Sequence, residues 1–86
     1  MQIQFSKKFE KQLKKQPNKV RSTLYRRLDI FLIDKYDPIL NNHALQGKYM
    51  GFYSINITGD VRALYYEKDD TLIIFAFIGS RSQLYG

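Results

Sequence analysis

Hydrophobic and polar positions form distinct blocks along the chain, and each block predicts an element of structure. The last apolar block, Leu72 to Ile78, is rich in β-branched and aromatic residues and too short for a typical core helix, so it predicts a strand. A strand that is apolar on both faces is usually covered on both, so we expect it at the centre of the sheet. Gly79 is expected to end this strand, and a short polar segment, residues 80–85, follows it.

The first third of the chain predicts one strand and two helices. Residues 1–5 alternate with period two, which indicates a short strand at the sheet edge. Ser6 is a favourable helix N-cap, and residues 7–16 continue without a helix breaker until Pro17-Asn18. A second helix is expected from residue 19 to about residue 35, with apolar residues at helical spacing: Val20, Leu24, Leu28, Phe31 and Leu32. Together they predict a helical hairpin.

The second half of the chain predicts an antiparallel meander. Asp37-Pro38 ends the second helix, and residues 39–48 are expected to form a loop. Strands are predicted at residues 52–57 and 61–68, with a turn after each. The fold class is therefore α+β: an N-terminal edge strand, a two-helix hairpin, a three-stranded antiparallel meander and a short terminal turn or helix. We expect a single domain over residues 1–86.

Composition and charge narrow the functional classes. The chain is 44% hydrophobic with a net charge of +6, and ten of its fourteen Lys and Arg residues lie within residues 1–35. Such a positive field favours a polyanion or an acidic protein as partner. The chain has no cysteine, no apolar run long enough to cross a bilayer and no signal-peptide pattern, so we expect a cytoplasmic protein without membrane contact.

Topology predicts that several polar residues meet at one edge of the sheet. The end of strand 52–57, the start of strand 61–68 and the end of strand 72–78 share that edge in a meander. This places five residues close together: Asn56, Asp60, Arg62, Arg81 and Tyr85. His43, in the loop before the sheet, can join them if the loop folds that way.

This set suits chemistry on a phosphodiester without a metal or other cofactor. Two arginines can stabilise a pentacoordinate phosphorus, and His43 or Asp60 can transfer protons. If the substrate is RNA, its own 2′-hydroxyl supplies the nucleophile, and Tyr85 can stack on a base. Each residue also has a structural interpretation. Asp60 can be a turn residue, Arg62 the ion-pair partner of Asp60 or Glu67, His43 a surface histidine, Arg81 a solvated tail residue and Tyr85 a terminal hydrophobic plug.

Four segments resemble the toxins of the RelE/ParE superfamily, and the YafQ branch most of all. They are His43-Ala-Leu-Gln-Gly47, Ser54-Ile-Asn-Ile-Thr-Gly-Asp60, Leu64-Tyr-Tyr66 and Ile78-Gly-Ser-Arg-Ser-Gln-Leu-Tyr85. The resemblance covers nearly the whole chain. It implies a ribosome-dependent mRNA endonuclease that acts through 2′-hydroxyl attack without metal and is held inactive by an acidic antitoxin.

The resemblance also assigns expected roles to individual residues. His43 matches the loop histidine of YafQ-like toxins, Asp60 their turn aspartate and Tyr85 their terminal aromatic residue. Arg62 and Arg81 look like the two arginines that RelE uses. The chain departs from the YafQ pattern at four positions, where that branch usually has histidine, tryptophan, arginine and histidine: Asn56, Val61, Phe77 and Arg81.

Contacts with RNA and the ribosome are expected from seven basic residues: Lys7, Lys8, Lys11, Lys14, Lys15, Arg26 and Lys48. Two other functions remain open at this point. One is a ParE-type toxin that acts on DNA gyrase and does not need the polar site. The other is a basic binding module that docks an acidic antitoxin or RNA without catalysis.

Overall fold

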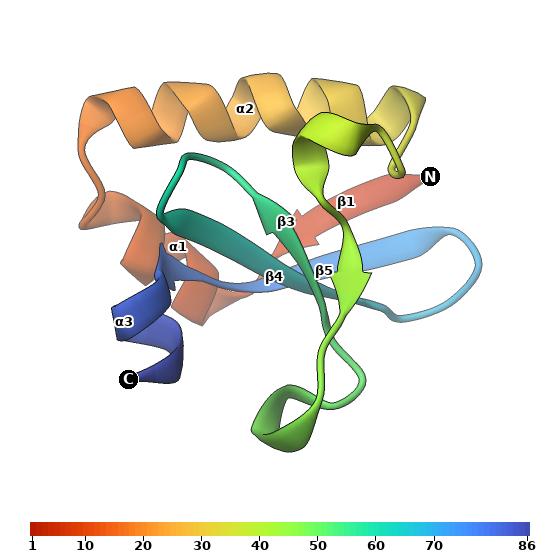
Figure 1. Ribbon diagram of the computed structural model, residues 1–86. Coiled ribbons are helices and arrows are strands. Elements are labelled where there is room, and N and C mark those ends of the chain that lie inside the picture. The colour runs from red at the N-terminus through yellow and green to blue at the C-terminus, as the bar shows by residue number, and fades with distance from the viewer.

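The computed structural model describes residues 1–86 and confirms the α+β fold (Figure 1). The helices are α1 (Lys7–Lys14), α2 (Asn18–Ile33) and α3 (Arg81–Tyr85), with 3-10 turns η1 (Pro38–Leu40) and η2 (Gly47–Tyr49). The strands are β1 (Gln2–Phe5), β2 (His43–Ala44), β3 (Tyr53–Asn56), β4 (Val61–Glu67) and β5 (Leu72–Ser80). None of the helices has the length and apolar character needed to cross a membrane.

The strands form one five-stranded sheet in the order β1-β5-β4-β3-β2. β1 lies at the edge, as its alternation predicts, and pairs in parallel with β5; the other pairs are antiparallel. The expectation of an unbroken loop over residues 39–48 was wrong, because His43 and Ala44 form β2 and pair with Ser54 and Tyr53. A strand of two residues is too short to show an alternation of apolar and polar positions, so only its pairing with β3 reveals β2.

β5 differs from its prediction in position and in length. It lies between β1 and β4, but the middle strand of the five is β4. The strand does not end at Gly79, because Gly79 pairs with Arg62 and Ser80 pairs with Val61. A Cβ at Gly79 would lie 3.0 Å from Oε1 and 3.2 Å from Cβ of Gln83, so the glycine lets α3 pack against the end of β5.

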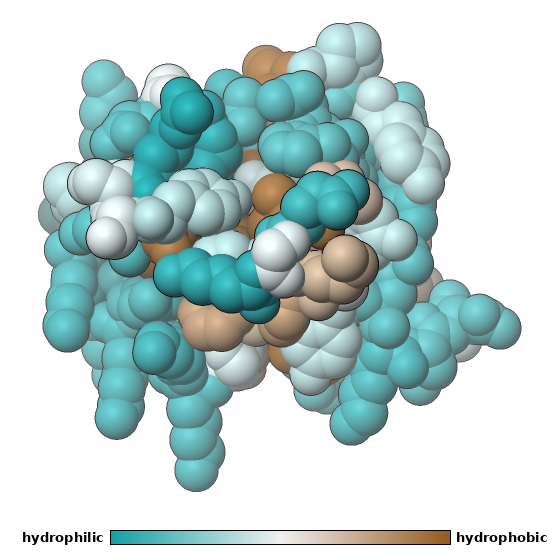
Figure 2. Space-filling model, turned by 60° about the horizontal axis from the view of Figure 1, so that its bottom comes forward, coloured by the Kyte–Doolittle hydropathy of each residue, from teal (hydrophilic) through white to brown (hydrophobic).

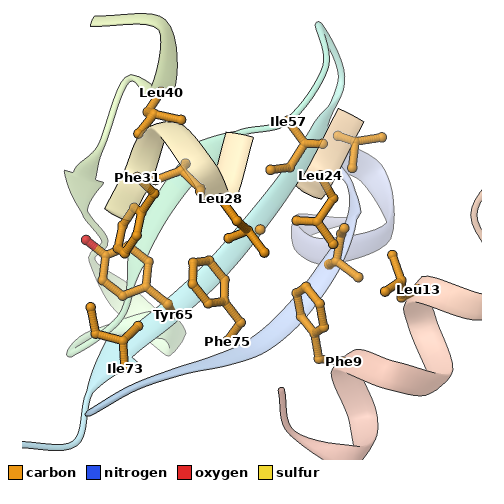
Figure 3. Packing of buried hydrophobic residues seen from close by; sticks show 14 residues of the cluster. Phe9, Leu13, Leu24, Leu28, Phe31, Leu40, Ile57, Tyr65, Ile73 and Phe75 are labelled. Atoms are coloured by element: carbon orange, nitrogen blue, oxygen red, sulfur yellow. The ribbon is translucent and has the colours of Figure 1, made fainter. Parts of the chain in front are cut away.

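The hydrophobic core lies between the sheet and the two long helices, as Figure 3 shows. Phe75 of β5 is fully buried at its centre, with its ring centroid 5.9 Å from Phe9, 5.6 Å from Phe31 and 5.2 Å from Tyr65. Leu32 was expected in the buried stripe of α2, but it is 49% exposed. Leu32 lies about 100° around the helix from Phe31, which takes the core position.

The buried hydroxyl of Tyr65 is expected to make the protein less stable at alkaline pH. This hydroxyl exchanges hydrogen bonds with the side-chain amide of Asn42, at 2.8 and 3.0 Å, and burial raises the pKa of Tyr65 from 10.0 to about 12. The native state therefore keeps a proton that the unfolded chain loses above pH 10. We expect the free energy of unfolding to fall by at most about 2–3 kcal/mol as pH rises through this window.

Urea unfolding of the wild type and of Tyr65→Phe, below pH 10 and close to pH 12, tests this expectation. The variant should be less stable than the wild type below pH 10, because Asn42 loses a partner, but should show a shallower decline with pH. An equally steep decline in both proteins would contradict the assignment to Tyr65.

Candidate functional site

A polar hollow of about 330 Å³ lies on the sheet face opposite the two long helices. Figure 2 brings the underside of the molecule toward the viewer and shows hydrophobic residues in the middle, surrounded by hydrophilic ones. The lining residues are Asn41, His43, Leu45, Ser54, Arg62, Arg81 and Tyr85. Four of the five residues predicted for catalysis therefore line one hollow.

Strand register explains why these residues share a face. His43 pairs with Ser54, and Arg62 pairs with both Asn56 and Gly79. Side chains of directly paired residues project from the same side of a sheet. Their sequence neighbours project to the opposite side, where Ile55 and Ala63 are fully buried in the core. Successive side chains of β3 and β4 thus point alternately to the core and to the hollow, which places the polar residues of both strands at the hollow.

The guanidinium of Arg62 is oriented by the turn between β3 and β4. Its Nη1 donates to the carbonyl oxygens of Thr58 at 3.0 Å and Val61 at 3.2 Å, and its Nη2 donates to that of Gly59 at 3.3 Å. These bonds use three of the five N–H donors and leave Nε–H and one N–H on Nη2. Those two donors form one edge of the planar group, the geometry that grips two oxygens of a phosphate.

Arg81 is the second arginine of the hollow, and its side chain is free. It is the first residue of α3, where Ser80 and Gln83 form a capping box that fixes the start of the helix. The backbone N–H of Arg81 donates to the carbonyl of Asp60 at 3.2 Å, which ties α3 to the β3–β4 turn. The exposed guanidinium makes no hydrogen bond or ion pair within the chain, so all its donors can reach a ligand.

His43 lines the hollow and has one ring nitrogen that can act as an acceptor. Its Nδ1 lies 2.8 Å from the carbonyl oxygen of Asn41. A carbonyl only accepts hydrogen bonds, so Nδ1 carries the proton in the neutral ring and Nε2 has the free lone pair. His43 is thus arranged to accept a proton. Tyr85, at the end of α3, is 45% exposed at the same hollow.

Two residues that topology placed at this edge do not line the hollow. Asp60 is exposed in the β3–β4 turn, where its backbone carbonyl accepts the N–H of Arg81. Asn56 lies beside Arg62 in the sheet, and its Oδ1 is buried without a partner. The proton-transfer role of Asp60 stays a prediction. Sequence reasoning also missed three lining residues, Asn41, Leu45 and Ser54, of which Ser54 alone carried a signal as a small polar residue in an alternating strand.

An aromatic cluster beneath the sheet supports α3. Tyr49 of η2 lies with its ring centroid 5.6 Å from Phe77 and 5.6 Å from Tyr85, and its hydroxyl donates to the carbonyl of Leu84 at 2.8 Å. Phe52 joins the same cluster, 6.2 Å from Tyr49. The segment after β2 therefore packs against the helix that carries Arg81 and Tyr85.

Tyr49→Phe is expected to loosen α3 without unfolding the protein. The variant keeps the ring contacts but loses the bond to Leu84, which is worth about 0.5–1.5 kcal/mol. Hydrogen exchange should become faster in α3 and stay unchanged in β4. Tyr53→Phe serves as control because Tyr53 lies on the core face, stacked on Tyr65. Equal exchange of α3 in wild type and Tyr49→Phe would contradict a supporting role.

Four of the seven predicted RNA contacts line one hollow along α1 and its C-cap. Lys7, Lys8, Lys11 and Lys15, with Gln12, line a surface hollow of about 400 Å³. A smaller hollow shares Gln12 and Lys15 with this lysine groove and continues to residue 83 of α3, which also carries Arg81. The lysine groove thus adjoins α3, the helix that carries Arg81 and Tyr85.

The other three predicted contacts lie apart from the lysine groove. Lys14 is exposed at the end of α1, and Arg26 on α2 donates to Thr23 Oγ1 at 3.0 Å. The ammonium of Lys48 lies 5.1 Å from the ring centroid of Tyr49, on the segment beside α3.

Comparisons with known proteins agree with the fold and with the earlier resemblance. A family model described as a bacterial toxin of type II toxin-antitoxin system, YafQ, matches residues 1–86. No curated protein sequence matches the chain. The crystal structure of YafQ from E. coli strain BL21(DE3) is 23% identical, with a TM-score of 0.80, over 99% of this chain and 98% of that chain.

Two further structures extend the comparison. The E. coli DinJ-YafQ toxin-antitoxin complex contains a chain 23% identical, with a TM-score of 0.77, over 99% of this chain and 97% of that chain. A copper-bound mutant toxin from Helicobacter pylori is 30% identical, with a TM-score of 0.71, over 96% of this chain and 97% of that chain. The similarity therefore extends over essentially the entire length of each protein.

Proposed function

This chain belongs to the YafQ family of bacterial toxins of type II toxin-antitoxin systems, and from that premise we propose that it is a metal-independent endoribonuclease that cuts mRNA on the ribosome. The observation that supports the proposal is the shared hollow, which Arg62, Arg81 and His43 line together.

The mechanism follows from what each group can do. The 2′-hydroxyl of the RNA attacks the adjacent phosphorus while Nε2 of His43 accepts its proton. Negative charge grows on the phosphoryl oxygens in the transition state, and Arg62 and Arg81 stabilise it there. The bond from phosphorus to the 5′-oxygen then breaks, that oxygen takes up a proton from solvent water, and a 2′,3′-cyclic phosphate remains. Tyr85 stacks on a neighbouring base and helps to hold the strand.

The lysine groove supplies the affinity for the polyanion. It places four positive charges along α1 and its C-cap, and phosphate contacts of this kind position a nucleic acid without selecting a sequence. Ribosomal RNA and the message are the polyanions that such a toxin meets in the cytoplasm.

An acidic antitoxin is the proposed protein partner. The chain carries a net charge of +6, and the E. coli YafQ chain described above is held in a complex with DinJ. By analogy, a cognate antitoxin would neutralise the basic surface of this chain. An open reading frame beside the gene that encodes an acidic C-terminal segment would support this partner.

Cleavage of a translated transcript by the purified chain tests the proposed activity. We expect cuts within the message on translating ribosomes, new ends with 2′,3′-cyclic phosphate, and no cut where the scissile nucleotide carries 2′-deoxyribose. Cleavage of the 2′-deoxy position would exclude the proposed nucleophile. Loss of gyrase supercoiling without cleavage would identify a ParE-type toxin. If the chain neither cleaved RNA nor inhibited gyrase, the remaining function would be that of a binding module.

A further inference from the structure

Ser54 is a buried hydroxyl in the floor of the hollow that the proposed mechanism does not use. The residue is 1% exposed, and its Oγ has no hydrogen-bond partner in the protein. Most buried polar side chains in native proteins are hydrogen-bonded, because an unpaired buried hydroxyl loses its bonds to water and gains nothing in return. An orphaned hydroxyl that lines a hollow therefore indicates a partner that arrives with a ligand.

The position of Ser54 defines which ligand atom it can meet. Tyr53 and Ile55 face the core, so Ser54 projects from the site face, in the same row as its partner His43. Arg62 lies in the next row of that face, opposite Asn56. Ser54, His43 and Arg62 therefore line the same hollow, and a ligand bound there lies within reach of neighbouring rows of this sheet face.

The chemistry around Ser54 favours an anionic oxygen. The charged side chains that line the hollow with it are two arginines, and no carboxylate lines it. A serine hydroxyl can donate one hydrogen bond, and bonds to ionised acceptors are about twice as strong as neutral ones. Phosphodiester oxygens are the ionised acceptors that this proposed function would bring into the hollow.

We propose that Ser54 is a substrate-binding residue whose Oγ–H donates to a non-bridging oxygen of the RNA phosphodiester held by Arg62 and Arg81. The proposal rests on the proposed function for the identity of the ligand. It adds a neutral donor from β3 to the two charged donors, Arg62 from β4 and Arg81 from α3.

Binding of a short RNA that carries 2′-deoxyribose at the scissile position, followed by fluorescence anisotropy, separates this role from simple space filling. Ser54→Ala should weaken binding about tenfold or more, which corresponds to about 1.4 kcal/mol. The melting temperature of the free variant should stay unchanged or rise, because the substitution removes an unsatisfied buried group. Ser22→Ala is the matched control, since Ser22 is exposed on α2 and bonds only to the carbonyl of Lys19.

Each outcome decides the proposal. Unchanged affinity in Ser54→Ala, or no binding by the wild type, would overturn it, as would a melting temperature lowered by several degrees, which would reveal a hydrogen bond inside the protein. Cleavage on ribosomes with unchanged Ser54→Ala binding would remove only the role of Ser54. Ser54-dependent binding without any cleavage would keep the phosphate site and reject the nuclease.

Discussion

Replacing Arg81 with alanine is expected to lower RNA cleavage by about 100- to 1,000-fold, the usual effect of removing one donor that stabilises transition-state charge. Arg81 is exposed at the start of α3 and makes no side-chain bond within the chain. The substitution therefore removes a ligand contact and no structural one. The melting temperature should stay close to that of the wild type, and growth arrest on expression should be relieved.

Lys19→Ala is the matched control for charge, since Lys19 is an exposed cation on α2 that does not line the hollow. It should retain nearly full cleavage, because both variants lose one positive charge and only Arg81→Ala loses a donor at the phosphate. Cleavage rates from single-turnover assays on translating ribosomes provide the comparison. Undiminished cleavage by Arg81→Ala would exclude Arg81 from the chemistry and favour a function that bypasses the hollow.

Phe75→Ala is expected to have the largest effect on stability. Phe75 is fully buried, and its ring contacts Phe5, Phe9, Phe31 and Tyr65. Truncating a core phenylalanine lowers the free energy of unfolding by about 3–5 kcal/mol. This is a large part of the total, which is about 5–15 kcal/mol for a typical domain. Since each kcal/mol shifts the melting temperature of a domain this small by about 4–8 °C, the variant should be largely unfolded under conditions in which the wild type is folded.

Urea unfolding followed by circular dichroism measures this loss. Phe75→Leu serves as the control, because it keeps an apolar side chain in the core and should lose much less stability. A cost below about 1 kcal/mol for Phe75→Ala would show that the helices and sheet can close around the missing ring. Such a result would contradict the conclusion that Phe75 is the central residue of the hydrophobic core.

The two substitutions probe opposite sides of the same sheet. Core residues of β3 and β4 alternate with site residues, so Ile55 is fully buried among apolar side chains while Ser54 lines the hollow. Stability and chemistry can therefore be changed separately, although they depend on the same strands. This separation allows a loss of toxicity in Arg81→Ala to be interpreted as a loss of chemistry.

Much of the fold could be predicted because hydrophobic periodicity reports which face of an element is buried. The edge strand, both long helices and the three strands of the meander follow directly from the pattern. β2 and the last two residues of β5 did not, because His43 and Ala44 are too few to show a period and Gly79 reads as a breaker. In both places, hydrogen bonds to a neighbouring strand decide the structure.

The candidate site could be predicted in part for a similar reason. Antiparallel topology brings Arg62 and Arg81 to one edge of the sheet whatever the loop details, and the structure places both at one hollow. Topology could not distinguish Asp60, which turns its side chain to solvent, from residues that face the hollow. It also could not identify Ser54 or Tyr49, because burial without a partner and a bond to α3 are properties of packed side chains.

The amino-acid sequence by itself determined the α+β class, the order of the main elements, the concentration of positive charge in the first third and the residue types available for catalysis. Tertiary structure alone decided which of those residues share a hollow, which edge of Arg62 stays free and how α3 is held. The physical reason is that periodicity and charge are properties of the chain itself. Contact between residues far apart in sequence depends instead on register, on turn geometry and on the packing of both sheet faces.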